Sequence, residues 1–195
     1  MSLTARQVSL YTHTIVIWRN TETFAGDGKP TAWTWQPSGG YGVSTTVTSG
    51  TASATQTVGS TTGMSAGDTL YFVTTDTTRV ISSVTDGTTV VLTATITTTT
   101  AEKVTKVVSC YGDIGKSQQG PNGVLMVEND NLFTFDEFHM EDTMDVNVGD
   151  VIKMITGPEA GEFWMVRGNA QVKNRRANML KVLCSRTPTA PNGVS

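Results

Sequence analysis

The sequence predicts an all-β protein: a small β-barrel with an inserted, threonine-rich β-sandwich or barrel-like module. Runs of β-branched residues recur along the chain, and turns are supplied by 19 glycines and six prolines. No long apolar pattern with the 3.6-residue period of a helix accompanies these runs. Only 161–177 offers room for a helix, and Gly168 interrupts it. Strands joined by turns are therefore expected throughout.

The middle of the chain predicts the inserted module. From Tyr41 to Thr105, 23 of 65 residues are threonine, a bias that would indicate low complexity if strand signals were absent. Such signals lie at 69–74, 78–84 and 89–95. The Asp86-Gly87 turn between the last two is a strong hairpin signal. The 38–105 segment is thus expected to fold as a module of its own.

The flanking residues predict the barrel. Strand signals lie at 14–18 and 107–111, after a turn within 146–155, and within 173–184, and Pro37–Gly40 is a natural hinge before the module. We therefore expect residues 1–37 and 106–187 to form one discontinuous barrel, with 188–195 as a mobile tail.

A Gly-Asp turn precedes a strand in both parts of the chain. It occurs at Gly67-Asp68 in the module and at Gly149-Asp150 in the barrel. Glycine supplies the positive φ that such a turn needs, and aspartate bonds nearby backbone amides. Two copies do not make a repeat, but they suggest two barrels built by similar rules.

Composition excludes several classes of protein. The net charge is −3 and the pI about 5.3, which argues against a generally basic nucleic-acid binder. Charged residues make up only 16% of the chain. A surface with so few charges is suited to being covered by neighbouring proteins in an assembly. Cys110 and Cys184 are expected to be reduced core thiols. No signal peptide, membrane-spanning run or membrane partner is expected.

Catalysis and metal binding find little support. His139 lies among Glu137, Glu141 and Asp142, but without an established ligand spacing. His13 is expected to be a hydrogen-bonded rim residue. No nucleophile elbow, phosphate-binding loop or paired-cysteine motif occurs, and the acidic Gly157–Gly161 segment fits a hairpin turn. We expect no enzyme activity, no cofactor and no metal.

Two segments of opposite charge and one polar loop are the candidate functional features. Residues 128–150 hold eight acids and no Lys or Arg, whereas 167–186 hold six basic residues and no acid. Each is expected to be solvated or to face a partner, the basic one a neighbour's acids or DNA phosphates. The predicted acidic edge comprises Glu137, Glu141, Asp142 and Asp145, and the predicted basic patch comprises Arg167, Lys173, Arg175 and Arg176. Long polar loops such as 112–123 are often functional; its candidate residues are Asp113, Lys116, Gln118, Gln119 and Asn122.

The outer segments resemble a known family. Tyr11–Arg19 resembles the first strand of tailed-bacteriophage head-closure proteins, also called stoppers or head-tail joining proteins. Three further features follow in the order of that family: the Cys110-Tyr111 strand with its polar loop, the turn and strand at 148–152, and Gly161–Val166 followed by the strand ending at Leu183. The resemblance covers roughly residues 8–36 and 106–186. The threonine-rich module is absent from the minimal family pattern.

The resemblance implies a structural virion protein at the phage neck, assembled in the host cytoplasm. Such a protein forms a homo-oligomeric ring below the portal and adaptor, docks the tail and helps to retain packaged double-stranded DNA without reading its sequence. The 112–123 loop would project into the channel. A tail-terminator or tail-tube component is the nearest alternative. A glycan-binding adhesin is the alternative from another class, and it would require exposed aromatics in the module, where only Tyr41, Tyr71 and Phe72 are available.

Overall fold

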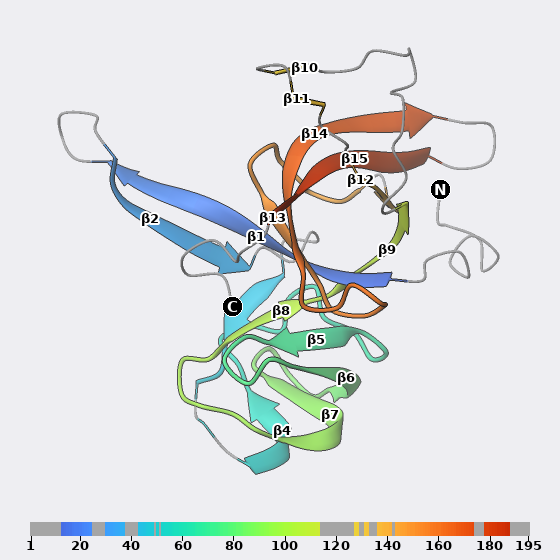
Figure 1. The fold of residues 1–195 in the computed structure, drawn as a ribbon. Helices are drawn as coiled ribbons and strands as arrows, with labels where there is room; N and C mark the ends of the chain where they lie inside the picture. The colour runs from blue at the N-terminus through green and yellow to red at the C-terminus, as the bar shows by residue number, and fades with distance from the viewer. Residues whose placement is uncertain are drawn as a thin grey trace. The chain divides into compact units, whose positions relative to one another are not determined.

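The protein is all-β, as predicted (Figure 1). The computed structural model describes residues 13–24, 30–37, 43–48, 50, 52–113, 127–128, 131–132, 136–141, 143–173 and 178–187. In β10, β11, the part of β2 before Pro37 and several strand ends it describes the backbone alone. The 161–177 segment, the one stretch considered for a helix, contains strand β14 (Phe163–Lys173) instead.

Six strands close into one antiparallel barrel, hereafter the closed barrel. Their order is β13-β14-β15-β12-β9-β1, and an additional pairing of β13 with β1 completes the ring. Strand β2 pairs with β1 outside this ring. The bounds are β1 His13–Phe24, β2 Pro30–Pro37, β9 Val108–Asp113, β12 Asp136–Glu141, β13 Val151–Met154 and β15 Asn178–Thr187. A separate short hairpin joins β10 (Val127–Glu128) to β11 (Asn131–Leu132).

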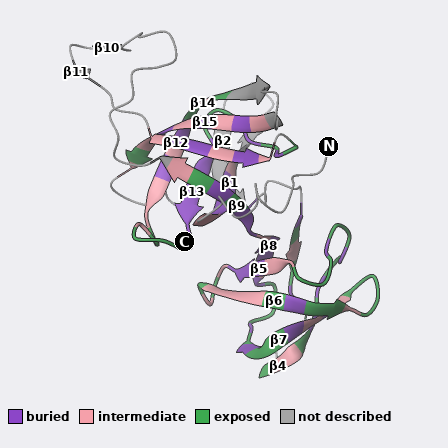
Figure 2. Cartoon of the chain, turned by 90° about the vertical axis from the view of Figure 1, so that its right-hand side faces the viewer, coloured by how far each residue is buried: buried purple, intermediate pink, exposed green. Residues whose placement is uncertain are grey.

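Aromatic and sulfur-containing side chains fill the closed barrel. Phe138 and Trp164 are fully buried and meet edge to face, with ring centroids 5.5 Å apart. This geometry is favoured by the ring quadrupoles. Cys110 and Cys184 are free and buried, as expected. Figure 2 shows the alternation of buried and more exposed residues that such an interior produces.

The threonine-rich segment forms a second, curled sheet, hereafter the threonine-rich sheet. Its order is β3-β8-β5-β6-β7-β4, and a bridge between Val47 and Val58 connects the ends of its two edge strands. Its core includes Leu70, Phe72 and Ile81. The bounds are β3 Ser44–Thr46, β4 Ala52–Thr57, β5 Thr69–Phe72, β6 Thr77–Val84, β7 Thr89–Thr97 and β8 Lys103–Lys106.

The chain divides into two compact units. Of the described residues, 13–15 and 109–187 belong to one unit, and 16–108 belong to the other. The division therefore falls inside β1, between Ile15 and Val16. The predicted boundaries at 37 and 106 are not tested by this division and stay predictions.

The Asp86-Gly87 hairpin forms where the sequence predicts it, between β6 and β7. The aspartate side chain organises the turn: Asp86 Oδ1 accepts bonds from the Thr88 amide (2.7 Å) and hydroxyl (3.1 Å). These bonds favour the carboxylate and lower the pKa of Asp86. Gly87 is not among the described glycines with positive φ, so here the acid defines the turn.

The two Gly-Asp turns have the same geometry. Gly67 and Gly149 have φ values of 92° and 93°. The Asp68 carboxylate accepts the Ser65 amide, and the Asp150 carboxylate accepts the Asn147 amide, both at 2.8 Å. Since each turn feeds the first strand of a hairpin, β5–β6 or β13–β14, the local rule seen in the sequence is confirmed.

The equivalence extends to the strand order of both sheets. Around the sheet, β3-β8-β5-β6-β7-β4 corresponds to β9-β1-β13-β14-β15-β12. In chain order the threonine-rich sheet runs from β3 to β8 without interruption. The closed barrel has the same order except that its last strand, β1, comes first in the chain. The two sheets are thus related by a circular permutation.

The residue register agrees with this correspondence. Thr69 faces Val80 in one hairpin, as Val151 faces Met165 in the other. The next strand pair of each sheet carries a bulge just beyond these positions, between Ile81 and Ser83 and between Val166 and Gly168. Bulges set local twist and bend. Shared turn, register and bulge indicate that one folding rule builds both sheets.

The closed barrel depends on a contact between the first strand and the loop after β13. The Ile155 amide donates to the Thr14 carbonyl (2.8 Å), and the Thr14 amide donates to the Thr156 hydroxyl (2.9 Å). Beside them, His13 packs on Gly157, whose φ is 106°. A Cβ at Gly157 would lie 2.6 Å from His13 Nδ1. His13 is thus a packing residue, and its buried Nδ1 has no hydrogen-bond partner among the described residues.

Replacing Gly157 by alanine should destabilise the protein by about 3 kcal/mol, from backbone strain plus the clash with His13. Gly161 provides the matched control, because its φ is 89° and a Cβ there would meet nothing within 4 Å. Gly161→Ala should cost about 1–2 kcal/mol. Urea unfolding of both variants measures the difference. Equal losses would contradict a closing role for the His13–Gly157 contact.

Candidate functional site

The structure describes part of the predicted site residues. Asp113 ends β9, where its backbone faces Glu137, and Lys173 ends β14. Arg167 and Asp145 are exposed and Glu141 is half-buried. The remaining predicted site residues lie outside the described part of the chain: Lys116, Gln118, Gln119, Asn122, Asp142, Arg175 and Arg176.

The acidic segment contains a buried strand. In β12, Phe138 and Met140 are fully buried, and acids or His139 occupy the alternate positions. The structure does not place Glu137 at a solvated edge, because this residue is only 5% exposed. The period-two pattern Glu-Phe-His-Met-Glu is a strand signal that the abundance of acids conceals.

Glu137 is neutralised within its own chain. One carboxylate oxygen pairs with the Lys181 ammonium, and the other lies 3.4 Å from His139 Nε2. The antiparallel pairing of β12 with β15 brings these groups together, since His139 is opposite Lys181. At Glu137 and Lys181, the acidic and basic segments therefore meet within one subunit. This pair is therefore a poor candidate for holding two subunits together.

Tyr111 extends this group across a third strand. It faces His139 in the β9–β12 register, with ring centroids 6.1 Å apart, and is 38% exposed. Tyr111, His139 and Lys181 thus form one row over β9, β12 and β15, with Glu137 beside it. We call these four residues the ionic row.

The threonine-rich sheet shows that the fold does not need the ionic row. By the shared register, Thr55, Thr57 and Thr89 occupy the positions of Glu137, His139 and Lys181. Thr55 and Thr57 are exposed and Thr89 is half-buried. Threonines therefore satisfy the same strand positions, so the ionic row is specific to the closed barrel.

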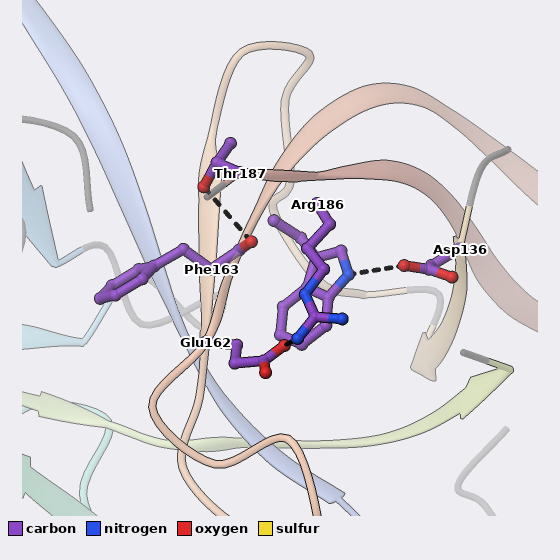
Figure 3. Close-up of polar contacts among 6 residues, drawn as sticks. Asp136, Glu162, Phe163, Arg186 and Thr187 are labelled. Carbon is purple, nitrogen blue, oxygen red and sulfur yellow. Dashed lines mark hydrogen bonds and ion pairs between the residues drawn. The ribbon is translucent and has the colours of Figure 1, made fainter. Parts of the chain in front are cut away.

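A second polar cluster surrounds Trp164 and includes Asp136, Glu162 and Arg186, which Figure 3 labels. The indole Nε1 donates to Asp136 (2.7 Å), which satisfies this buried donor. The Arg186 guanidinium lies 6.0 Å from the ring centroid and pairs with Glu162. The cluster ties β12, the loop before β14, and β15 together. No local sequence pattern reveals this cluster, because Asp136, Trp164 and Arg186 are far apart in the chain.

Arg167 is the described basic residue most open to a partner. It occupies the bulge between Val166 and Gly168 and is exposed, with its Nε donating to the Ser185 hydroxyl (2.8 Å). A bulge can redirect a side chain away from the ladder. Arg186 is also 57% exposed at its side chain, but Glu162 balances its charge.

The described residues provide no metal site. They include no group of three or more His, Cys, Asp or Glu side chains placed to hold an ion. They also include no helix of the length and apolarity required to cross a membrane.

The buried thiols have perturbed acidities. Burial raises the pKa of Cys110 to about 12. Burial raises the pKa of Cys184 as well, with smaller contributions from Asp136 and Cys110. Thiolates are the reactive form of cysteine, so both groups are poor nucleophiles at neutral pH. This supports a packing role for both.

The comparisons with known proteins identify no family. No protein-family model matches the sequence, and no curated protein matches it. A solution structure of protein SF1141 from Shigella flexneri 2a, a structural genomics target, is a distant structural neighbour. The identity is 13% and the TM-score 0.43, over 92% of this chain and 96% of that one.

Removing the Glu137 charge should be costly. Glu137→Gln leaves the mostly buried Lys181 ammonium without its anion, for a loss of about 3 kcal/mol in unfolding free energy. Glu162→Gln is the matched control, because its pair with Arg186 is far more exposed. It should cost less than about 1 kcal/mol. Chemical unfolding tests both; equal small losses would show that the ionic row contributes no stability.

The thiols and Tyr71 should make the fold sensitive to alkali. Burial and the bond to Asp76 also raise the pKa of Tyr71 above 10.0, and the unfolded cysteines titrate near 9.0. Above those values, the unfolded chain loses protons that the folded chain keeps. Stability should therefore be unaffected by these groups below pH 9 and fall as the pH rises from 9 to 12. Urea midpoints across this range measure the effect, and Tyr71→Phe should flatten the fall above pH 10.

Proposed function

We propose that this protein is a structural virion protein of a tailed phage that forms a ring at the head-to-tail junction. In this role it docks the tail below the portal and adaptor, and helps to retain packaged DNA. One observation carries the proposal. The described parts of the segments that resemble head-closure proteins contribute to the closed barrel: β1, β9, the turn before β13, β14 and β15. Segments scattered over 175 residues thus belong to one structure.

The threonine-rich sheet fits the role of an added module. Several of its charged groups are used internally: Lys106 pairs with Asp68 at 2.8 Å, and Glu102 accepts amides of Thr75 and Thr99. The Tyr71 hydroxyl donates to Asp76 at 2.6 Å. Its exposed positions are rich in threonine hydroxyls, which suits decoration more than a strong ionic interface.

The burial of aromatic residues argues against the adhesin alternative. A glycan-binding module would present aromatic rings to its sugar, but Tyr71 is 1% exposed and Phe72 is fully buried. Tyr41 lies outside the described residues. The alternative of a tail-terminator or tail-tube component remains, because such proteins would need the same ring assembly.

The charges suggest where ring contacts form. A head-to-tail ring needs two different complementary patches on each subunit. Since Glu137 and Lys181 neutralise each other, the exposed Arg167 is better placed than either of them for contacts with neighbours. The 112–123 loop, of which residues 114–123 lie outside the described part of the chain, stays the predicted channel element.

The proposal predicts rings in the purified protein. Electron microscopy should show annular particles, and sedimentation should give a mass that is a multiple of 20.8 kDa. Arg167→Glu should weaken ring association about fivefold at low salt, because a rim charge contributes about 1 kcal/mol. Ser82→Glu is the matched control, because Ser82 occupies the equivalent exposed bulge of the threonine-rich sheet. A protein that stays monomeric at high concentration would refute the proposal.

A further inference from the structure

The two sheets differ in where their sixth strand comes from. In the threonine-rich sheet, β8 lies between β3 and β5, and residues 98–102 connect it directly to β7. In the closed barrel the same place, between β9 and β13, is taken by β1. The contact between Thr14 and Thr156 spans 142 positions in the sequence. We call this position between β9 and β13 the slot. It is therefore filled by a strand that lies far in the sequence from the strands on either side of it.

The slot cannot remain empty. Ile15, Val16, Ile17 and Trp18 of β1 are at most 1% exposed, so the strand is buried on both faces. Without it, β9 and β13 would have unpaired backbone groups and the core would be open to water. Exposed edges of this kind recruit strands from other chains. Each barrel thus needs one copy of β1, but the pairing does not specify which chain provides it.

The connection of β1 to the rest of the chain would allow a second copy to supply this strand. The strand runs from one compact unit into the other, since Ile15 belongs to the first unit and Val16 to the second. The whole of 16–108 separates the inserted end of β1 from β9. An element connected to its barrel only through another unit can enter the barrel of a second copy while making the same contacts.

We propose that β1 is exchanged between copies, so that each closed barrel is completed by the first strand of a neighbour. The exchange rests on the proposed ring: it would link consecutive subunits through the Thr14–Ile155 and Thr14–Thr156 bonds. No new type of contact is required. The slot between β9 and β13 is then the interaction surface, and a second copy of this chain is the partner.

A disulfide across the slot distinguishes the two arrangements. The hydroxyls of Thr14 and Thr156 are 3.0 Å apart, so Thr14→Cys with Thr156→Cys places two thiols in contact. Under exchange, oxidation of the assembled protein should give a ladder of covalent multimers on a non-reducing denaturing gel. A quantitative disulfide that runs as a monomer would overturn the exchange.

Two controls and one second measurement complete the test. The parent chain, with its buried Cys110 and Cys184, should give no cross-link. Met165→Cys with Ser185→Cys joins residues that face each other in the β14–β15 hairpin, so it should always run as a monomer. If the slot variant does not fold, differently tagged Thr14→Cys and Thr156→Cys chains can be co-expressed. A disulfide between the two tags supports exchange, and its absence from the co-assembled protein overturns it.

The outcomes separate the exchange from the proposed function. Rings with a monomeric slot disulfide would leave the ring role in place and remove the exchange. A parent chain that forms no ring would refute the ring role itself. Covalent dimers without rings would support β1 exchange. In that case two copies would exchange their first strands with each other.

Discussion

The contact of Thr14 in β1 with Ile155 and Thr156, directly after β13, is the one on which the closed barrel depends. Strands β9 and β12–β15 come from one continuous part of the chain, residues 108–187. Their ring stays open until a strand from the opposite end of the chain enters. Closing so large a loop costs conformational entropy before any contact compensates for it. Burial of both faces of β1 compensates for this cost, which explains why its Ile15–Trp18 run is apolar throughout.

The internal comparison separates what the fold requires from what each sheet has added. Both keep the Gly-Asp turn, the hairpin register and the bulge, so these features are requirements. The core differs: Gln56 holds the position of Phe138 and is fully buried, with its amide bonded to the Ser53 carbonyl and the Thr98 hydroxyl. A barrel can thus accept a buried amide in place of an aromatic ring when each polar atom finds a partner.

Sequence reasoning found the elements with local signals. The all-β class, the β5, β6 and β7 strands and both Gly-Asp turns follow from β-branched runs and turn chemistry. It missed β12, because Asp136, Glu137 and Glu141 made a half-buried strand resemble a solvated segment. It also missed the Asp136–Trp164–Arg186 cluster and the Glu137–Lys181 pair. Both depend on the β12–β15 pairing, which has no local signature in the chain.

These pairings change how the charge pattern bears on assembly. Acidic and basic segments in one chain suggest ionic contacts between subunits, but antiparallel strands can satisfy those charges internally, as Lys181 does for Glu137. A ring that relied on the remaining exposed charges would be sensitive to salt. In the proposed role, the ring must instead hold together while it retains packaged DNA. An exchanged strand, held by backbone bonds and buried apolar side chains, would provide strength that salt does not screen, and surface charges would then serve mainly to align the subunits.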